Sequence, residues 1–498
     1  MSPDVHPDDR AGQLPTPTLR TPLLRRVCSL SLACWVAAWG CVSADEPLDD
    51  RAAQLELFFV RSLLTVARSR PHQLKLRFDA MATSPFAFLR GSEALYWRDL
   101  RDPAMPFGSS ELPDVDLVAL QGDAHPENIG VYAGPTIELN DFDTAGFGRP
   151  HWEVRRAVAA LLVALRQANP TVDRAAVARR LAEAYVATIA AGDLSPVDGS
   201  DVGAIVQKRV ASAQKAGAER SELVDFTVVT GGTRRLKRGN TDPADPREAL
   251  LDAPPAVIDA LGATVAAYRQ TLHDDAFFRD YFRVKDVARR CGQGVGSLTA
   301  VRMYALVEGP TASIDDDVIL QLKEASDAAL DADLALGAPY PDQAARVVDR
   351  QRRLQSSPAA DPRLGHARLL DLPVVVSTIT GFQKTVRITD LAGRSDADIL
   401  GFATDVGATL ARAHARGVTV DGRAALPSLK AWLSARGEAF VTDTTRAGSA
   451  YADQVVGDHA RFLALRDRLG PTLGLTAPAP NDTPYDDPAR AVLDPPCP

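Results

Sequence analysis

The sequence Gly122-Asp123-Ala124-His125-Pro126-Glu127-Asn128, with Asn140-Asp141-Phe142-Asp143 shortly after it, is the stretch that decides the fold. Short apolar segments, residues 115–120 and 136–139, precede the two motifs and are predicted as strands. An Asp followed five residues later by an Asn places both side chains on one tight loop after the first strand. The second strand then returns the chain and brings Asp141 beside that loop.

These two motifs supply the residue types that phosphoryl transfer requires. A carboxylate orients and deprotonates the attacking hydroxyl, and oxygen ligands hold the Mg²⁺ that bridges the nucleotide phosphates. We therefore interpret Asp123 as the catalytic base, and Asn128 and Asp141 as Mg²⁺ ligands. Asp143 is either a further metal ligand or a helix cap, and His125 is expected to brace the loop. The alternative is that Asp123 and Asn128 only stabilise turns, where Asp, Asn and Gly are common.

A second motif, Gly292-Gln293-Gly294-Val295-Gly296-Ser297, lies between predicted strands at residues 284–290 and 299–307. Glycines allow backbone N–H groups to approach phosphates closely. Gly292, Gly294, Gly296 and Ser297 are therefore candidate nucleotide-binding residues. Lys323 ends the next predicted strand and can pair with the phosphates. A plain hairpin with a surface lysine is the alternative.

The spacing of Asp123, Asn128 and Asp141 resembles that of aminoglycoside and choline kinases, whose loop reads His-Gly-Asp-x-His-x-x-Asn. Gln121 stands where that pattern has its leading His. The resemblance implies that Glu153, at the start of the following helix, braces the catalytic loop. In ordinary kinases the Gly-rich loop and its Lys precede the catalytic loop, whereas here they follow it. Residues 407–416 resemble the helix that leads into the loop, so the resemblance implies a circularly permuted, two-lobed α+β kinase-like fold.

The same segments resemble the bacterial family known as domain of unknown function 2252, from about Leu74 to about Leu465. The resemblance implies little about the substrate. One helix departs from the family pattern, because it reads Arg350-Gln351-Arg352 where the family usually has Gly-Gln-Arg. The motifs that carry the resemblance, besides the catalytic loop, include Ser84-Pro85-Phe86-Ala87-Phe88-Leu89-Arg90-Gly91, Gly294-Val295-Gly296-Ser297, Gln321-Leu322-Lys323-Glu324-Ala325, Leu410-Ala411-Arg412-Ala413-His414-Ala415 and Tyr451-Ala452-Asp453-Gln454.

The N-terminus is typical of an export signal. A positive region with Arg25 and Arg26 precedes an apolar stretch, residues 27–40, which is too short to span a membrane comfortably. Val42-Ser43-Ala44 fits a cleavage site, and a lipid anchor at Cys41 is the alternative. We therefore expect an exported periplasmic or envelope-associated protein, or a cytoplasmic one if the leader is spurious.

Composition and cysteine usage narrow the function classes. The chain has 498 residues and a formal net charge of -8, which argues against a general nucleic-acid binder. After the leader only Cys291 and Cys497 remain, which is not a disulfide scaffold. The predicted organisation is a signal peptide (1–44), a helical lobe with the catalytic and metal-binding loops (45–280), a β-rich nucleotide-binding lobe (281–395), C-terminal helices that complete the helical lobe (396–475) and a disordered tail (476–498).

The sequence thus predicts a phosphotransferase that uses Mg²⁺ and ATP or another nucleotide to phosphorylate an unknown, small hydroxylated acceptor. Export conflicts with ATP as the donor, because compartments outside the cytoplasm are poor in ATP. Two alternatives remain open. One is a metal-dependent phosphoesterase or hydrolase that uses Asp123, His125, Asp141, Asp143 and His151. The other is an exported binding protein with a degenerate kinase-like site.

Overall fold

The structure of the protein is a computed structural model. It describes residues 49–476 and Cys497, except for 103, 106, 108–111, 113, 133–135, 243–244, 246, 273–281, 331–339, 357–360. The predicted signal peptide, its cleavage site and Cys41 lie outside the described residues, as does most of the predicted tail. Within the described residues, no helix combines the length and apolar character that a membrane crossing requires.

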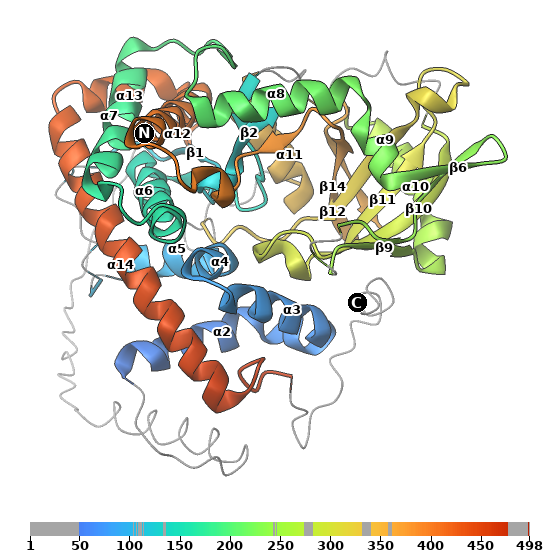
Figure 1. Cartoon of the computed structure of the whole chain (residues 1–498), viewed down its shortest axis with the longest axis horizontal. Coiled ribbons are helices and arrows are strands. Elements are labelled where there is room, and N and C mark those ends of the chain that lie inside the picture. The colour runs from blue at the N-terminus through green and yellow to red at the C-terminus, as the bar shows by residue number, and fades with distance from the viewer. Residues whose placement is uncertain are drawn as a thin grey trace, which may run out of the picture. The chain divides into compact units, whose positions relative to one another are not determined.

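Long helices form the first part of the fold (Figure 1). They are α6 (Pro150–Ala168), α7 (Arg174–Ala191), α12 (Asp396–Arg416) and α14 (Gly437–Leu469). Helix α7 packs along α12, and α14 packs along α6. Small and branched apolar residues line α6, and Ala157, Leu161 and Leu165 are fully buried, which allows neighbouring helices to approach on several sides. The shorter helices α8 (Ala204–Ala218) and α13 (Ala425–Leu433) both contact α12.

Within the described residues, four helices precede the loop at residues 122–128: α2 (Asp50–Ser69), α3 (Pro71–Ala82), α4 (Pro85–Gly91) and α5 (Glu93–Arg101). The segment around Phe86 and Phe88 forms α4. The Ser84 side chain accepts a hydrogen bond from the backbone N–H of Ala87, and Pro85 occupies the first helical turn. A capping residue followed by proline is a favourable helix start, and this signal outweighs the short length of the segment.

A seven-stranded antiparallel sheet forms the second part, with strand order β13-β14-β12-β11-β10-β9-β8. The strands are β8 (Gly239–Asn240), β9 (Ala249–Asp252), β10 (Val284–Cys291), β11 (Arg302–Val307), β12 (Val318–Glu324), β13 (Gly365–Leu369) and β14 (Leu372–Ile379). Alternate residues of β11 enter two different apolar clusters, so both faces of the sheet are covered. Helix α10 (Pro255–Arg269) packs on one face.

This sheet begins earlier in the sequence than the predicted boundary at residue 281. Strands β8 and β9 pair at its edge, and α10 covers it, although all three lie in the segment assigned to the helical lobe. The basic run around Arg234 and Arg235 forms a hairpin of β6 (Thr227–Thr230) and β7 (Thr233–Leu236). Helix α9 (Ser221–Phe226) precedes this hairpin.

Short strands flank the two acidic motifs, residues 122–128 and residues 140–143. Strand β1 (Val118–Leu120) pairs with β4 (Gly146–Gly148). A second small sheet has the order β15-β2-β3-β5, formed by β15 (Lys384–Thr385), β2 (Ile129–Tyr132), β3 (Thr136–Leu139) and β5 (Val197–Asp198). The mixture of helices and antiparallel sheets confirms the α+β class.

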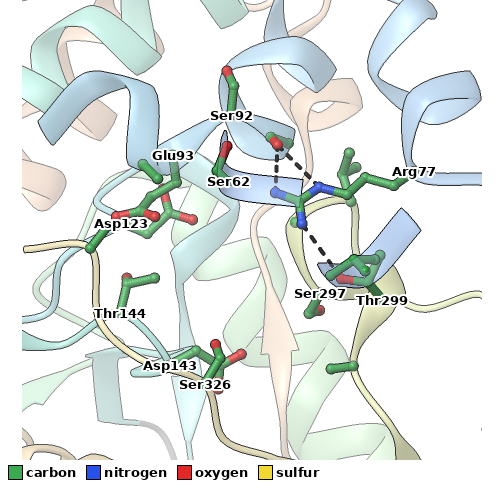
Figure 2. A pocket seen from close by; sticks show the side chains of 18 of the residues that line it. Ser62, Arg77, Ser92, Glu93, Asp123, Asp143, Thr144, Ser297, Thr299 and Ser326 are labelled. Carbon is green, nitrogen blue, oxygen red and sulfur yellow. Dashed lines mark hydrogen bonds between the residues drawn. The ribbon is translucent and has the colours of Figure 1, made fainter. Parts of the chain in front are cut away.

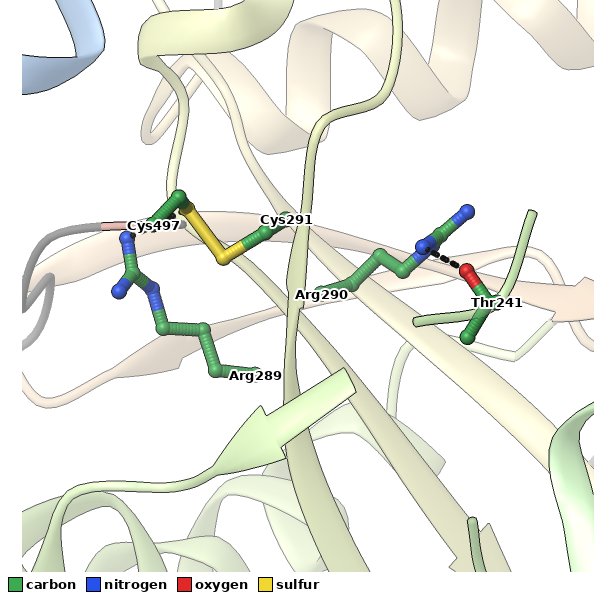
Figure 3. Close-up of a disulfide and its surroundings, with 5 residues drawn as sticks. All are labelled: Thr241, Arg289, Arg290, Cys291 and Cys497. Carbon is green, nitrogen blue, oxygen red and sulfur yellow. Dashed lines mark hydrogen bonds between the residues drawn. A yellow bond between two sulfur atoms is a disulfide. The ribbon is translucent and has the colours of Figure 1, made fainter. Parts of the chain in front are cut away.

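The two cysteines that follow the leader form a disulfide. Cys291 ends β10, and its Cα lies 5.8 Å from that of Cys497 (Figure 3). This pairing could not be predicted from the sequence, because the two cysteines are 206 positions apart. The bond fixes a point near the chain's C-terminal end directly before Gly292.

Candidate functional site

The loop after β1 carries Asp123 and is shaped by one glycine and one glutamine. Gly122 has φ +95°, and a Cβ there would lie 2.2 Å from the carbonyl oxygen of Thr144. The side chain of Gln121, fully buried, donates to the backbone oxygens of Asn140 and Asp141 and accepts from the Asp123 N–H. This residue, which departs from the kinase pattern, therefore ties the two acidic motifs together.

Asn128 and His125 complete that loop. Residues Pro126–Asn128 form a 3-10 turn, and Nδ2 of Asn128 donates to the backbone oxygen of Asp123 at 3.0 Å. Nε2 of His125 lies 3.6 Å from Oδ2 of Asp123. Burial lowers the pKa of His125 to about 4, so its imidazole is neutral at physiological pH. The bracing role of His125 stays a prediction.

Asp141 and Asp143 both pair directly with Lys323. Nζ of Lys323 lies 3.0 Å from Oδ1 of Asp141 and also pairs with Oδ2 of Asp143. Asp141 has φ +54°, a strained conformation of the kind that concentrates at functional sites. Burial and the charge of Asp141 raise the pKa of Asp143 to about 6. Burial alone would raise the pKa of Asp141, but the Lys323 ammonium outweighs it and holds that pKa well below its usual range.

The Gly-rich loop, residues 292–297, is held by hydrogen bonds from one arginine side chain. Gly292 and Gly294 have positive φ angles of +83° and +77°, which favour glycine. Arg302, at the start of β11, donates to Oε1 of Gln293 at 2.9 Å and to Oγ of Ser297 at 3.2 Å. The loop continues as a 3-10 turn from Gly296 that packs against α3 and α4.

A buried network of polar side chains supports the loop at residues 122–128. The Glu153 carboxylate accepts the backbone N–H groups of Gln121 and Gly122, and it lies 2.6 Å from Nε2 of His414. Tyr185 bonds the other ring nitrogen of His414 at 2.9 Å. His414, in the segment 407–416, thus contacts Glu153, which in turn accepts the backbone N–H groups of the loop.

These side chains surround a cleft of about 530 Å³ (Figure 2). Among the predicted site residues, those that line it are Asp123, His125, Asp141, Asp143, Gly294, Gly296 and Ser297. Lys323 lies behind the two aspartates that it contacts, and Gly292 lies beside the disulfide. His151 does not reach the cleft, because its ring stacks on Trp432 with 5.7 Å between centroids.

Several charged residues of the site were missed by sequence reasoning. The guanidinium of Arg156, on α6, contacts Oδ1 of Asp123, with Nε at 3.0 Å. Glu93 lines the cleft beside Asp123, and burial together with the Asp123 charge raises its pKa to about 8. Arg346, on α11 (Gln343–Leu354), donates to the backbone oxygens of Asp143 and Ser326. The long apolar run of α6 was a usable signal, since an arginine within it must be buried and therefore paired.

The oxygen-bearing side chains of the site can be compared with the ligands that Mg²⁺ usually takes. The described residues contain no group of three or more His, Cys, Asp or Glu that could hold a metal ion by themselves. Mg²⁺ usually takes only one or two protein carboxylates and completes its octahedron with phosphate oxygens and water. Asp141 and Asp143, which line the cleft, fit that smaller requirement. Asn128 is not among the lining residues, and its Nδ2 donates to the backbone oxygen of Asp123.

Comparison with known proteins gives one match. The model of a family described as an uncharacterized protein conserved in bacteria, DUF2252, matches residues 68–465. No curated protein matches the chain. No solved structure matches it either.

Proposed function

The chain belongs to the uncharacterized bacterial family DUF2252, and we propose that it is a kinase-like phosphotransferase. In this proposal a Mg²⁺-bound nucleotide, ATP or another, donates a phosphoryl group to a small hydroxylated acceptor. The proposed architecture is a two-lobed, kinase-like fold in which the catalytic loop precedes the Gly-rich loop in the sequence.

The contact between Lys323 and Asp141 carries this proposal. These residues are 182 positions apart, yet Nζ of Lys323 lies 3.0 Å from Oδ1 of Asp141. Kinase chemistry requires such proximity, because a phosphate-binding lysine and a metal-binding aspartate must reach the same phosphates. Asp123 and the glycines of residues 294–296 line the same cleft, so the base, the metal ligands and the phosphate-binding loop are available together.

Each side chain has a defined task in the proposed reaction. Asp123 accepts the proton of the acceptor hydroxyl, whose oxygen attacks the terminal phosphorus while the nucleoside diphosphate leaves. Arg156 holds the Asp123 carboxylate in place. Mg²⁺, held by Asp141, Asp143 and Asn128, would neutralise charge on the phosphates. Lys323 exchanges a carboxylate partner for a phosphate oxygen, and the Gly294–Ser297 backbone covers the phosphates.

One feature differs from the protein-kinase arrangement. In protein kinases the lysine pairs with a glutamate of the following helix. Here α11 follows β12 in the described chain and offers no glutamate. Its Arg346 instead donates to backbone oxygens of the Asp143 loop and of Ser326. The proposed site therefore uses Asp141 and Asp143 as the carboxylate partners of Lys323.

A thermal-shift plate tests the proposal. Purified protein is heated with Mg²⁺ alone, with nucleoside triphosphates alone and with both, and Asp141→Asn serves as the matched control because Asn tolerates positive φ. We expect stabilisation that requires both Mg²⁺ and nucleotide and that the variant lacks. If the wild-type protein shows no nucleotide-dependent shift, the phosphotransferase proposal fails. A shift with divalent metal alone would favour the hydrolase alternative.

A further inference from the structure

Arg77, on helix α3, is a cation of the cleft with no carboxylate partner among the described residues. Its Nε and Nη2 donate to the backbone oxygen of Gly91 at 3.2 and 2.8 Å, and Nη1 lies 3.5 Å from Oγ1 of Thr299. Figure 2 shows its guanidinium extending between Glu93 and Ser297. The two bonds to Gly91 fix the orientation of the group without neutralising its charge.

The other two arginines that line the cleft in the described part of the chain are paired: Arg70 contacts Glu324 and Arg90 contacts Glu127. Arg156, which does not line the cleft, contacts Asp123. Arg77 is half-buried, and a cation withdrawn from water without a counterion is destabilised, so burial lowers the pKa of Arg77 to about 10. Its charge nevertheless persists at physiological pH, so a compensating anion is favourable at this position.

The acid nearest to Arg77 does not supply that anion. Glu93 interacts with Arg77 electrostatically, but burial and the neighbouring Asp123 raise the pKa of Glu93 to about 8. The Glu93 carboxyl is therefore mostly protonated near pH 7. Two hydroxyl groups of the cleft lie on the Gly-rich side: Thr299, which Arg77 contacts, and Ser297 of the Gly-rich loop.

We propose that Arg77 binds a phosphate group of the ligand in this cleft, with Ser297 and Thr299 as further hydrogen-bond donors. A guanidinium matches phosphate oxygens with two parallel donors, and the glycines of the adjacent loop allow a close approach of the backbone. The choice of phosphate over other anions rests on the proposed function. Two sources share this chemistry: the terminal phosphate of the nucleotide, and a phosphate carried by the acceptor.

Calorimetric titration of four proteins tests the inference: wild type, Arg77→Gln, Arg77→Lys and Lys75→Gln. Lys75 is the matched control, since it lies exposed on the same helix and pairs with Asp79. The probes are a Mg²⁺-bound non-hydrolysable ATP analogue, inorganic tripolyphosphate and glycerol phosphate. Arg77→Gln should weaken binding of a phosphate probe roughly tenfold or more, Arg77→Lys should weaken it less, and Lys75→Gln should leave it unchanged. Loss confined to the ATP analogue and tripolyphosphate identifies the donor's terminal phosphate, and loss confined to glycerol phosphate identifies the acceptor.

The possible results separate this inference from the proposed function. Unchanged affinity of a folded Arg77→Gln for every probe would overturn the inference, as would a wild-type protein that binds none of them. Should Arg77→Gln fail to fold, wild-type affinity in Arg77→Lys overturns it, because lysine keeps the charge but not the paired donors. If tripolyphosphate binding depends on Arg77 while no nucleotide binds, the anion subsite stands and the phosphotransferase proposal fails. If nucleotide binding requires Asp141 but no probe depends on Arg77, the reverse holds.

Discussion

Asp123 lies between a buried cation and a buried imidazole, and this position determines how its substitution acts. Asp123→Asn should reduce phosphoryl transfer by about 10²- to 10⁴-fold, the usual contribution of a general base, while nucleotide binding persists. The variant should also lose about 2 kcal/mol of stability, because Arg156 is fully buried and would keep its charge without a partner. Single-turnover kinetics and denaturant unfolding measure the two effects.

The double variant Asp123→Asn, Arg156→Gln separates them. Removing both charges should restore most of the stability without restoring turnover. Unchanged turnover in Asp123→Asn would show that this carboxylate is not the base.

Asp141 is the residue on which metal-dependent binding should depend. Asp141→Ala should abolish the Mg²⁺-dependent part of nucleotide affinity, since it removes a carboxylate that reaches the cleft and pairs with Lys323. Asp141→Asn controls for the positive φ of this position. Titration of nucleotide with and without Mg²⁺ checks the prediction, and equal affinities for wild type and both variants would assign Asp141 a structural role.

Some residues of the site can be recognised from the sequence, and others cannot. Asp123, Asn128 and Asp141 follow short strands at recognisable spacing, and Lys323 ends a strand, so their proximity could be proposed from the sequence. Arg77 could not, because an arginine on an amphipathic helix usually faces solvent, and only long-range packing brings it into a cleft. The actual metal, donor and acceptor stay predictions.

At the scale of elements, the sequence predicted most long helices and the strands of the Gly-rich lobe, whose periodicity is strong. It missed short elements such as α4, whose stability comes from one capping serine and from packing. It also missed that β8 and β9 extend the sheet, because two- and four-residue strands have too little periodicity to be recognised. Pairing with β10 over a long separation determines their state.

The junction between α12 and α8 should be sensitive to pH. Asp405, on α12, is buried and accepts the backbone N–H of Gly203 at 3.0 Å, and burial raises its pKa from 3.8 to about 7. Between about pH 4 and pH 7 the folded protein binds more protons than the unfolded chain, so this group makes stability fall as pH rises. Asp405→Asn keeps the hydrogen bond and removes the penalty.

The variant should therefore be more stable than the wild type above pH 7, by at most roughly 4 kcal/mol, and equally stable below pH 4. Denaturant unfolding from pH 4 to pH 9 measures the difference. A difference that does not change with pH would contradict this explanation.

At the scale of the whole molecule, the disulfide joins Cys497 to the end of β10. Reduction, or Cys497→Ser, should lower the free energy of unfolding by about 2–5 kcal/mol, because a long loop in the unfolded chain is no longer closed. Unfolding with and without reductant tests this, and Cys497→Ser should not respond to reductant. A non-reducing peptide map that shows both thiols free would contradict the pairing. Such bonds persist in oxidising compartments; export of the chain stays a prediction from the leader.

The length of that loop also determines how much time passes between the synthesis of the two cysteines. After Cys291 has been synthesised, 206 further positions must follow before its partner exists, which takes roughly 10 to 40 s at common rates of translation. Throughout that interval Cys291 is a lone thiol, and the cysteines already made are Cys28, Cys34 and Cys41. Each is a wrong partner that removal of the leader would eliminate. Early processing of the leader would thus protect the correct bond from competition.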